Sequence, residues 1–129
     1  MSSLRKKATT FADAMVDTLN DAKILGVRAG TEHRYTGVWV VVVEGRVFVR
    51  SWNDKPTGWF RAVINQSSGT IQVGKLEIPV QAKLPRSARI RDAVTLAFAE
   101  KYNTKGSQKW VKGFAEPARV LTTLEFIPG

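Results

Sequence analysis

Residues 46–52 place cationic and aromatic side chains on one face of a predicted β-strand. Successive side chains of an extended strand point to opposite sides, so Phe48, Arg50 and Trp52 share a side with Arg46. A guanidinium can meet two phosphate oxygens at once, and an indole offers a flat apolar wall for a ring system. Arg50 and Trp52 therefore predict a cleft for a planar, phosphorylated small molecule. The alternative is an exposed cation–π pair between the same two side chains.

Side chains that carry out catalysis unaided are scarce in this sequence. It has no cysteine, which removes disulfides, thiolate metal sites and cysteine nucleophiles, and it has one histidine, His33. It contains neither a Gly-x-Ser-x-Gly elbow nor a phosphate loop with a Gly-Lys-Ser/Thr ending. We therefore predict no metal site, assign no catalytic residue, and expect a bound cofactor to carry any redox chemistry.

The chain is strongly basic, with 20 lysines and arginines against 11 acidic residues and a net charge of +9. Such an excess favours anionic partners: a nucleic acid, an acidic membrane surface or a phosphorylated small molecule. Eight of the basic residues fall within 83–112, where the acidic residues are Asp92 and Glu100. A solvated helical face that aids solubility explains this cluster equally well.

The length of 129 residues predicts one domain, 1–129, with a single hydrophobic core. No apolar run approaches the roughly 18 residues of a membrane helix, so we expect no membrane association. The basic residues near the N-terminus are not followed by the apolar stretch of a secretory signal. A cytoplasmic protein is the expectation.

Helical spacing marks the start of the chain and a later segment. Leu4, Ala8, Phe11, Met15 and Leu19 form one apolar stripe, with Ser2 or Ser3 available as the helix cap. Ser87 is suited to cap a second helix. The pattern predicts an N-terminal helix over 1–21, the main strands over 22–83, a helical insertion over 86–115 and a closing strand over 118–128, with Pro117 ending the helical part.

The strands are short and are joined by tight turns. Residues 38–43 are all apolar, which predicts a strand buried on both faces. Glu44-Gly45 and Gly74-Lys75 predict two hairpin turns. Pro79 cannot donate a ladder hydrogen bond, so its strand is predicted at an edge or with a bulge. This order favours a mainly β barrel or sandwich with flanking helices.

The stretch 37–73 carries a more specific pattern. An apolar strand, the Glu44-Gly45 turn, a second strand ending in Ser51, and a short helix that opens with Trp59-Phe60 follow one another. This order resembles the flavin-binding split-barrel superfamily. It is similar to the pyridoxamine-phosphate-oxidase-like and deazaflavin-dependent nitroreductase-like branches, and to a small uncharacterised bacterial family beside them.

The resemblance implies a six-stranded antiparallel split β-barrel that forms a homodimer and holds FMN or a deazaflavin in a cleft. By position, the implied cofactor-binding residues are Arg34, Tyr35, Thr36, Arg50, Ser51, Trp52, Lys55 and Arg61. The function implied is that of a small oxidoreductase. Trp52 and Trp59 are suited to wall the flavin ring, although core packing is the simpler expectation for Trp59 and Phe60.

One departure from the family pattern affects the cofactor. Several members of the deazaflavin branch place a basic residue and glycines directly after the strand-ending serine. Here Trp52-Asn53-Asp54 stands in that place, and Lys55 is the nearest compensating cation. A barrel that is retained without its flavin is therefore an open alternative.

Two further functions remain open on the same barrel. A nucleic-acid-binding module is suggested by the net charge and by the aromatics interleaved with arginines over 46–52. A non-catalytic ligand-binding domain is the other, including a haem sensor with His33 as axial ligand, although a lone histidine in a polar loop is usually just solvated.

Overall fold

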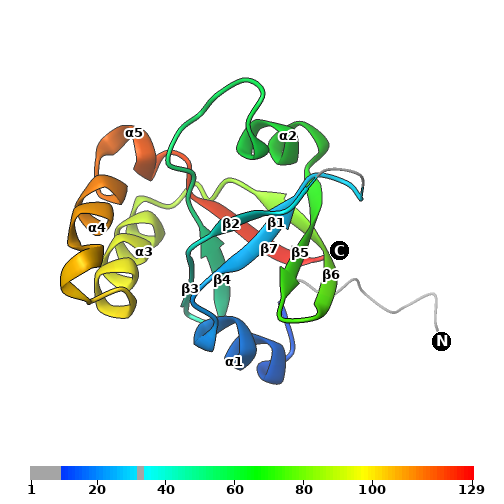
Figure 1. Ribbon diagram of the computed structural model, residues 1–129, viewed down its shortest axis with the longest axis horizontal. Helices are drawn as coiled ribbons and strands as arrows, with labels where there is room; N and C mark the ends of the chain where they lie inside the picture. Colours follow the sequence, from blue (N-terminus) through cyan, green and yellow to red (C-terminus); the bar gives the residue numbers. More distant parts are fainter. Residues whose placement is uncertain (1–9, 32–33) are drawn as a thin grey trace.

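Antiparallel strands dominate the computed structural model, which describes residues 10–31 and 34–129 (Figure 1). The strands are β1 (Leu25–Arg28), β2 (Thr36–Val38), β3 (Val40–Val43), β4 (Arg46–Val49), β5 (Ser68–Val73), β6 (Leu76–Lys83) and β7 (Leu124–Pro128). They form one sheet in the order β2-β1-β5-β6-β7-β4-β3, and every pairing is antiparallel. His33, Leu4, Ala8, Ser2 and Ser3, which carried predictions, lie outside the described residues.

The sheet closes into a nearly complete barrel through the chain itself. Its two end strands, β2 and β3, are separated by one residue, Trp39. The single strand predicted over 38–43 thus breaks at Trp39, and the sheet has seven strands rather than six. The break arises because Val38 pairs with Leu25 of β1 whereas Val40 pairs with Val49 of β4. The backbone N–H of Val40 donates to the Tyr102 hydroxyl at 3.0 Å.

Side chains on the two faces of the strands enter two hydrophobic clusters. The barrel interior contains Val47 and Val49 of β4, as their alternation predicts. Phe48 points outward, yet it is fully buried with Val41 under a covering helix. Strand β3 is therefore covered on both faces, as its unbroken run of valines indicates.

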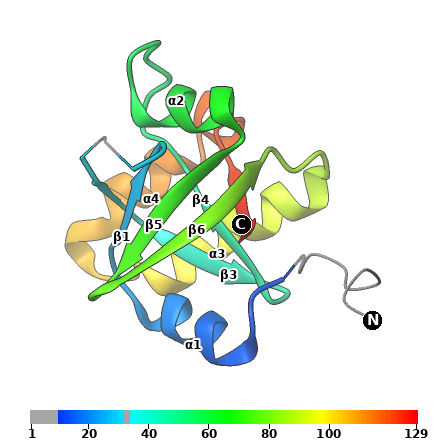
Figure 2. The same ribbon diagram turned by 90° about the vertical axis from the view of Figure 1, so that its right-hand side faces the viewer.

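Helices close the barrel and cover one side of it (Figures 1 and 2). They are α1 (Asp13–Asp21), α2 (Trp59–Gln66), α3 (Ala88–Lys101), the 3₁₀ turn η2 (Lys105–Ser107), α4 (Gln108–Phe114) and α5 (Pro117–Val120). Helices α1 and α2 lie at opposite ends of the barrel, and α3 packs on β3. Ser87 caps α3, as predicted, by accepting a hydrogen bond from the Ile90 N–H at 3.2 Å.

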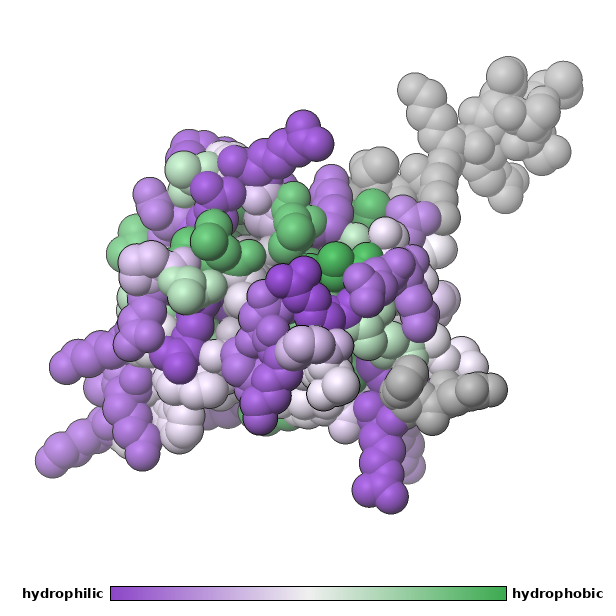
Figure 3. All heavy atoms as spheres, turned by 90° about the horizontal axis from the view of Figure 1, so that it is seen from above, coloured by the Kyte–Doolittle hydropathy of each residue, from purple (hydrophilic) through white to green (hydrophobic). Residues whose placement is uncertain are grey.

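The C-terminal part differs from the predicted strand over 118–128. Pro117 begins helix α5 instead of ending the helical region, because its missing N–H and fixed φ suit the first helical turn. The strand β7 starts only at Leu124 and pairs with β4 and β6. Leu121, just after α5, is 68% exposed. Figure 3, which looks down on the end with α2 and α5, shows apolar side chains lying among hydrophilic ones.

Both predicted hairpin turns are present, and Pro79 has an unexpected place. Glu44 and Gly45 adopt φ values of 54° and 74°, as a two-residue turn between β3 and β4 requires. Strand β6 lies between β5 and β7, so the predicted edge position for Pro79 is wrong. Pro79 lies beside Gly129, which is one residue beyond the end of β7, so the missing N–H of Pro79 removes no hydrogen bond from the β6–β7 ladder. The Pro79 carbonyl still accepts a hydrogen bond from the Gly129 N–H at 3.0 Å.

No helix within the described ranges 10–31 and 34–129 is long and apolar enough to cross a membrane.

Candidate functional site

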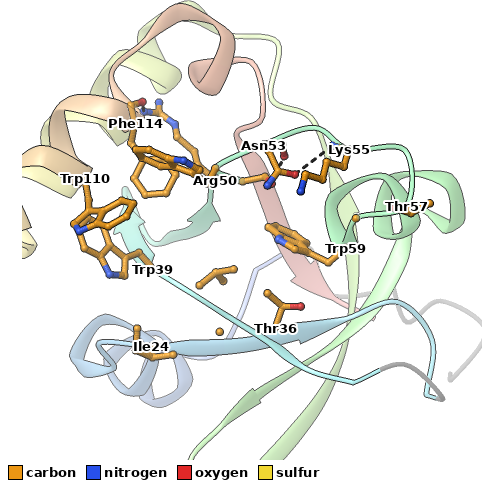
Figure 4. Close-up of a pocket in the computed structure, with 15 residues that line it drawn as sticks. Ile24, Thr36, Trp39, Arg50, Asn53, Lys55, Thr57, Trp59, Trp110 and Phe114 are labelled. Atoms are coloured by element: carbon orange, nitrogen blue, oxygen red, sulfur yellow. Dashed lines mark hydrogen bonds between the residues drawn. The ribbon is translucent and has the colours of Figure 1, made fainter.

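The main cleft opens where two paired strands part. Val40 and Val49 are the last partners of the β3–β4 ladder, and the chain diverges at the adjacent residues, Trp39 and Arg50. Between the diverging segments lies a cleft of about 630 Å³, within the usual size range of small-molecule sites (Figure 4). Its lining is Ile24, Thr36, Gly37, Val38, Trp39, Arg50, Ser51, Trp52, Asn53, Lys55, Thr57, Gly58, Trp59, Trp110 and Phe114. We call it the fork cleft.

All four tryptophans of the chain line the fork cleft. Trp59, at the start of α2, stands on one side, and Trp39 and Trp110 stand on the other (Figure 4). The ring of Trp39 stacks on that of Tyr102 with centroids 3.9 Å apart, which fixes its orientation. Phe60, next to Trp59, is 4% exposed in the barrel core, as predicted. The fork cleft therefore has aromatic walls on both sides.

The indole of Trp52 is held between α4 and α5. A Cβ atom added at Gly113 of α4 would overlap the six-membered ring of Trp52, so a side chain there is incompatible with this packing. The Arg119 guanidinium carbon lies 3.6 Å from the Trp52 ring centroid, and its Nε donates to the Trp52 carbonyl at 2.7 Å. The cation stacked on Trp52 is thus Arg119 rather than Arg50.

Arg50 lines the base of the fork cleft, but its guanidinium is committed to the protein. Arg50 is 1% exposed, and four of its five N–H groups donate at 2.7–2.8 Å. The acceptors are the hydroxyls of Thr95 and Thr123 and the carbonyls of Arg91 and Phe114. Burial lowers the pKa of Arg50 to about 10, while the charge of Asp92 raises it and that of Arg91 lowers it further. Arg50 ties β4 to α3 and α4.

The segment after Arg50 is anchored at its start and open at its end. The Ser51 N–H donates to the Thr122 hydroxyl at 3.0 Å, and that hydroxyl donates to the Ser51 carbonyl at 3.0 Å. The Ser51 hydroxyl donates to the Asn53 carbonyl. Lys55 is exposed, and within the described part of the chain no acidic group lies within salt-bridge distance of its ammonium. Lys55 is therefore a cation available to a ligand.

Three of the predicted site residues do not line the fork cleft. Arg61 forms a two-point ion pair with Asp54, at 2.6 Å for each contact, and this hydrogen bonding raises the pKa of Arg61. Tyr35 donates its hydroxyl to Glu77 at 2.7 Å, and its pKa is raised by burial first and by that hydrogen bond second. Arg34 is exposed and lies outside the lining. Thr36, Arg50, Ser51, Trp52 and Lys55 are brought together there.

The alternating face over 46–52 is not an open surface. Phe48 is fully buried, and Arg46 forms a two-point ion pair with Glu125 at 2.8 and 2.9 Å. Arg50 is buried as described above. Phe48 and Arg50 are therefore unavailable to stacked nucleic-acid bases, and Trp52 is the aromatic side chain of this face that stays exposed, at 36%.

Sequence reasoning missed the contribution of the helical insertion. Trp110 and Phe114 of α4 line the fork cleft, and Trp39, expected within a buried strand, also lines it. Trp110 is 42% exposed and is flanked by Lys109. A large aromatic on the wet side of a basic helix was the signal in the sequence that could have found it.

Within residues 10–31 and 34–129 no group of three or more acidic or histidine side chains is arranged to hold a metal ion.

Comparison with known proteins places this architecture in a family. Residues 14–126 match the family described as "Uncharacterized protein conserved in bacteria (DUF2255)". The chain belongs to this family. No curated protein matches the DUF2255 chain.

Solved structures share the fold of this DUF2255 protein at low sequence identity. A Listeria innocua protein titled "Putative Pyridoxamine 5'-phosphate oxidase" aligns with a TM-score of 0.62 and 11% identity, covering 90% of this chain and 91% of that chain. A FAD-binding protein from Mesorhizobium loti aligns with a TM-score of 0.56 and 12% identity, covering 93% of this chain and 89% of that chain. A conserved hypothetical protein from Mycobacterium tuberculosis aligns with a TM-score of 0.57 and 12% identity, covering 95% of this chain and 82% of that chain. The fold is that of the pyridoxamine 5'-phosphate oxidase-like and flavin-binding split barrels.

The fork cleft fits the ring of a flavin better than its phosphate. Aromatic walls stand on both sides of a space of about 630 Å³. Of the four cations expected at the cofactor, Arg50 is committed to protein acceptors, Arg61 is paired with Asp54, and Arg34 lies elsewhere. Lys55 therefore remains as the cation of the lining that can meet a phosphate.

Proposed function

We propose that this DUF2255 protein binds FMN or a deazaflavin in the fork cleft and acts as a small oxidoreductase. The observation that carries the proposal is the gathering of all four tryptophans around one cleft of about 630 Å³. An isoalloxazine ring is flat and largely apolar, so it packs well between Trp59 on one side and Trp39 and Trp110 on the other. The bound flavin would supply the redox chemistry.

The polar groups of the fork cleft suit the rest of such a cofactor. Strand β2 ends the hydrogen-bonded order of the sheet, so its outer edge, at Thr36 and Gly37, faces the cleft and pairs with no strand among the residues that the structure describes. Backbone groups on such an edge can pair with the hydrogen-bonding side of a flavin ring. Lys55 and Thr57 line the same cleft and are suited to a phosphate, which Arg50 cannot reach without giving up its own acceptors.

A titration with two ligands tests the proposal. FMN and riboflavin differ only by the phosphate, so their affinities separate binding of the ring from binding of the charge. We expect Lys55→Ala to lower FMN affinity about tenfold and to leave riboflavin affinity unchanged, because one charge-assisted contact is lost. The control is Lys75→Ala, an exposed lysine in the β5–β6 turn outside the fork cleft.

The outcomes are distinct. Absence of binding of FMN, riboflavin and a deazaflavin to the unaltered protein at micromolar concentration would refute the site. If Lys55→Ala and Lys75→Ala lowered FMN affinity equally, the net charge of the protein, and not a specific phosphate contact, would attract FMN. Bleaching of the bound flavin's visible absorption by a reduced nicotinamide nucleotide would test the oxidoreductase role, and a flavin that no hydride donor reduces would contradict it.

We also propose that the protein is a homodimer whose partner covers the mouth of the fork cleft. Ile24 and Trp52 line the cleft and are 58% and 36% exposed. Large apolar side chains gathered around one opening favour association. Light scattering should give twice the mass of one chain and a single-chain mass for Ile24→Lys. A single-chain mass for the unaltered protein would contradict the dimer.

A further inference from the structure

A second groove lies next to the fork cleft on the surface of α4 and α5. Its volume is about 530 Å³, and Trp52 and Trp110 belong to both linings. The two indoles meet edge to face, with centroids 4.9 Å apart and planes at 67°. They therefore form a wall with one cleft on each side. We call this second space the α4–α5 groove.

The α4–α5 groove is basic. Lys109 and Lys112 are three residues apart on α4, so they lie on the same side of the helix. Neither ammonium has a carboxylate within salt-bridge distance among the described residues. The acidic member of the lining, Glu116, is already paired with Arg119 at 2.8 Å. Two positive charges are thus left uncompensated beside the groove.

An aromatic platform lies beside these charges. Trp110 is 42% exposed, and the Lys109 ammonium lies over its ring, 5.0 Å from the centroid, so this flexible side chain must turn off the ring when a planar group stacks there. Trp52 cannot swing toward α4, because Gly113 already contacts its ring and Arg119 covers it. A planar group that packs on Trp110 would therefore meet a fixed wall and would bring an attached anionic group to within reach of Lys109 and Lys112.

We propose that the α4–α5 groove binds a nucleoside diphosphate unit, with the base on Trp110 and the two phosphates on Lys109 and Lys112. A base has a π-face that stacks on an aromatic side chain, and a pyrophosphate needs the two adjacent positive charges that this groove holds. A neutral ring would leave both ammonium groups unused, and an inorganic anion would leave the indole unused. The proposal does not depend on the flavin, because the groove has its own cations.

Calorimetric titration with ADP tests this site on the intact protein. We expect ADP to bind and the double variant Lys109→Ala/Lys112→Ala to lower its affinity by more than about tenfold, because two charge-assisted contacts are lost. Trp110→Leu should lower ADP affinity about tenfold and leave pyrophosphate affinity unchanged, because only the base stacks on the ring. Lys105→Ala is the matched control: Lys105 belongs to the same insertion and is exposed, but it does not line the groove.

Each further outcome decides the matter. ADP affinity that persists at saturating FMN supports two separate sites, whereas displacement of ADP by FMN would place the nucleotide in the fork cleft and overturn the proposal. If Lys105→Ala lowered ADP affinity as much as the double variant does, the attraction of ADP would come from the net charge of the protein and not from this groove. Affinity for oligothymidylate that rises with its length and exceeds that for ADP would replace the nucleotide by a single-stranded nucleic acid. No binding of ADP to the unaltered protein ends the proposal, whether or not flavin binds.

Discussion

The segment that leaves β4 is buried at one end and open at the other. Arg50 is 1% exposed and donates to four oxygen atoms of the protein, whereas Lys55, five residues later, is exposed with no acidic partner within the described residues. Both side chains line the same cleft and carry the same charge. The comparison teaches that lining a pocket does not make a cation available to a ligand: the donors of Arg50 are used to join β4 to α3 and α4, whereas the ammonium of Lys55 is exposed.

The largest loss of stability is expected when the hydrogen bonds of the Arg50 guanidinium are removed. Arg50→Met keeps an unbranched side chain but removes the guanidinium, so four oxygen atoms around it each lose one hydrogen-bond donor. Each buried acceptor left unpaired is costly, so we expect a loss of about 3 kcal/mol in the free energy of unfolding. Urea denaturation measures it. Arg86→Met, at an exposed arginine, is the control and should change stability by less than about 0.5 kcal/mol.

The same variant also decides whether Arg50 is a structural residue or a phosphate ligand. A fully stable Arg50→Met protein that had lost affinity for FMN but not for riboflavin would show that Arg50 is a phosphate ligand. The contrast with Lys55 would then be wrong.

A smaller effect is expected where Trp52, in the segment that follows β4, packs on Gly113 of α4. Gly113→Ala puts a Cβ atom into the space of the Trp52 ring, so the indole must move and the shared wall of the two clefts shifts. Overpacking of this kind costs about 1–3 kcal/mol. We expect thermal unfolding at a lower temperature and weaker binding of riboflavin. The control, Gly106→Ala, meets nothing within 4 Å, and a loss of stability equal to that of Gly113→Ala would contradict this packing.

The smallest effect concerns a second cation buried by the insertion. The Lys101 ammonium donates to the carbonyls of Ala22 at 2.6 Å and Val40 at 2.8 Å, and so joins α3 to the end of α1 and to β3. Burial lowers the pKa of Lys101 to about 8, while Asp21 favours the charged form. Between about pH 8 and the usual 10.5 the unfolded chain therefore binds more protons than the folded one.

It follows that this group makes the free energy of unfolding rise with pH across that window, by about 1 kcal/mol once solvent screening is allowed for. The rise should be smaller in Lys101→Met than in the unaltered protein and unchanged in Lys105→Met. Urea denaturation at pH 7.5, 9 and 10.5 compares the three. Identical pH dependence in Lys101→Met would show that the ammonium is as well solvated as Lys105.

Local pattern predicted much of the fold. The valine run of β3, the Glu44-Gly45 turn and the Ser87 cap are properties of neighbouring residues, so they could be read directly. The bend at Trp39 could not, because it depends on Tyr102, 63 positions later, which supplies the hydroxyl for the Val40 N–H. Helix α5 could not be predicted because alternating side chains over 118–126 imitate a strand, and because a proline can follow the end of one helix as well as begin another.

The lining of the fork cleft was predicted at its centre but not at its edges, and its role as a binding site stays a prediction. Strand alternation and the family resemblance predicted Arg50 and Trp52, the resemblance alone predicted Ser51, and all three line the fork cleft. Alternation gives the side of a strand but not what covers that side. The sequence therefore could not show that Arg50 would be enclosed by Thr95, Thr123 and α4, or that Trp110 would form a wall.

The central claim is that a flavin ring lies among the tryptophans of the fork cleft. The most direct measurement is tryptophan emission during titration with riboflavin, which carries the ring without the phosphate. Because all four tryptophans line the cleft, we predict that saturation quenches most of the emission together with the flavin's own fluorescence. Tryptophan emission that is unchanged at saturating riboflavin would contradict the account.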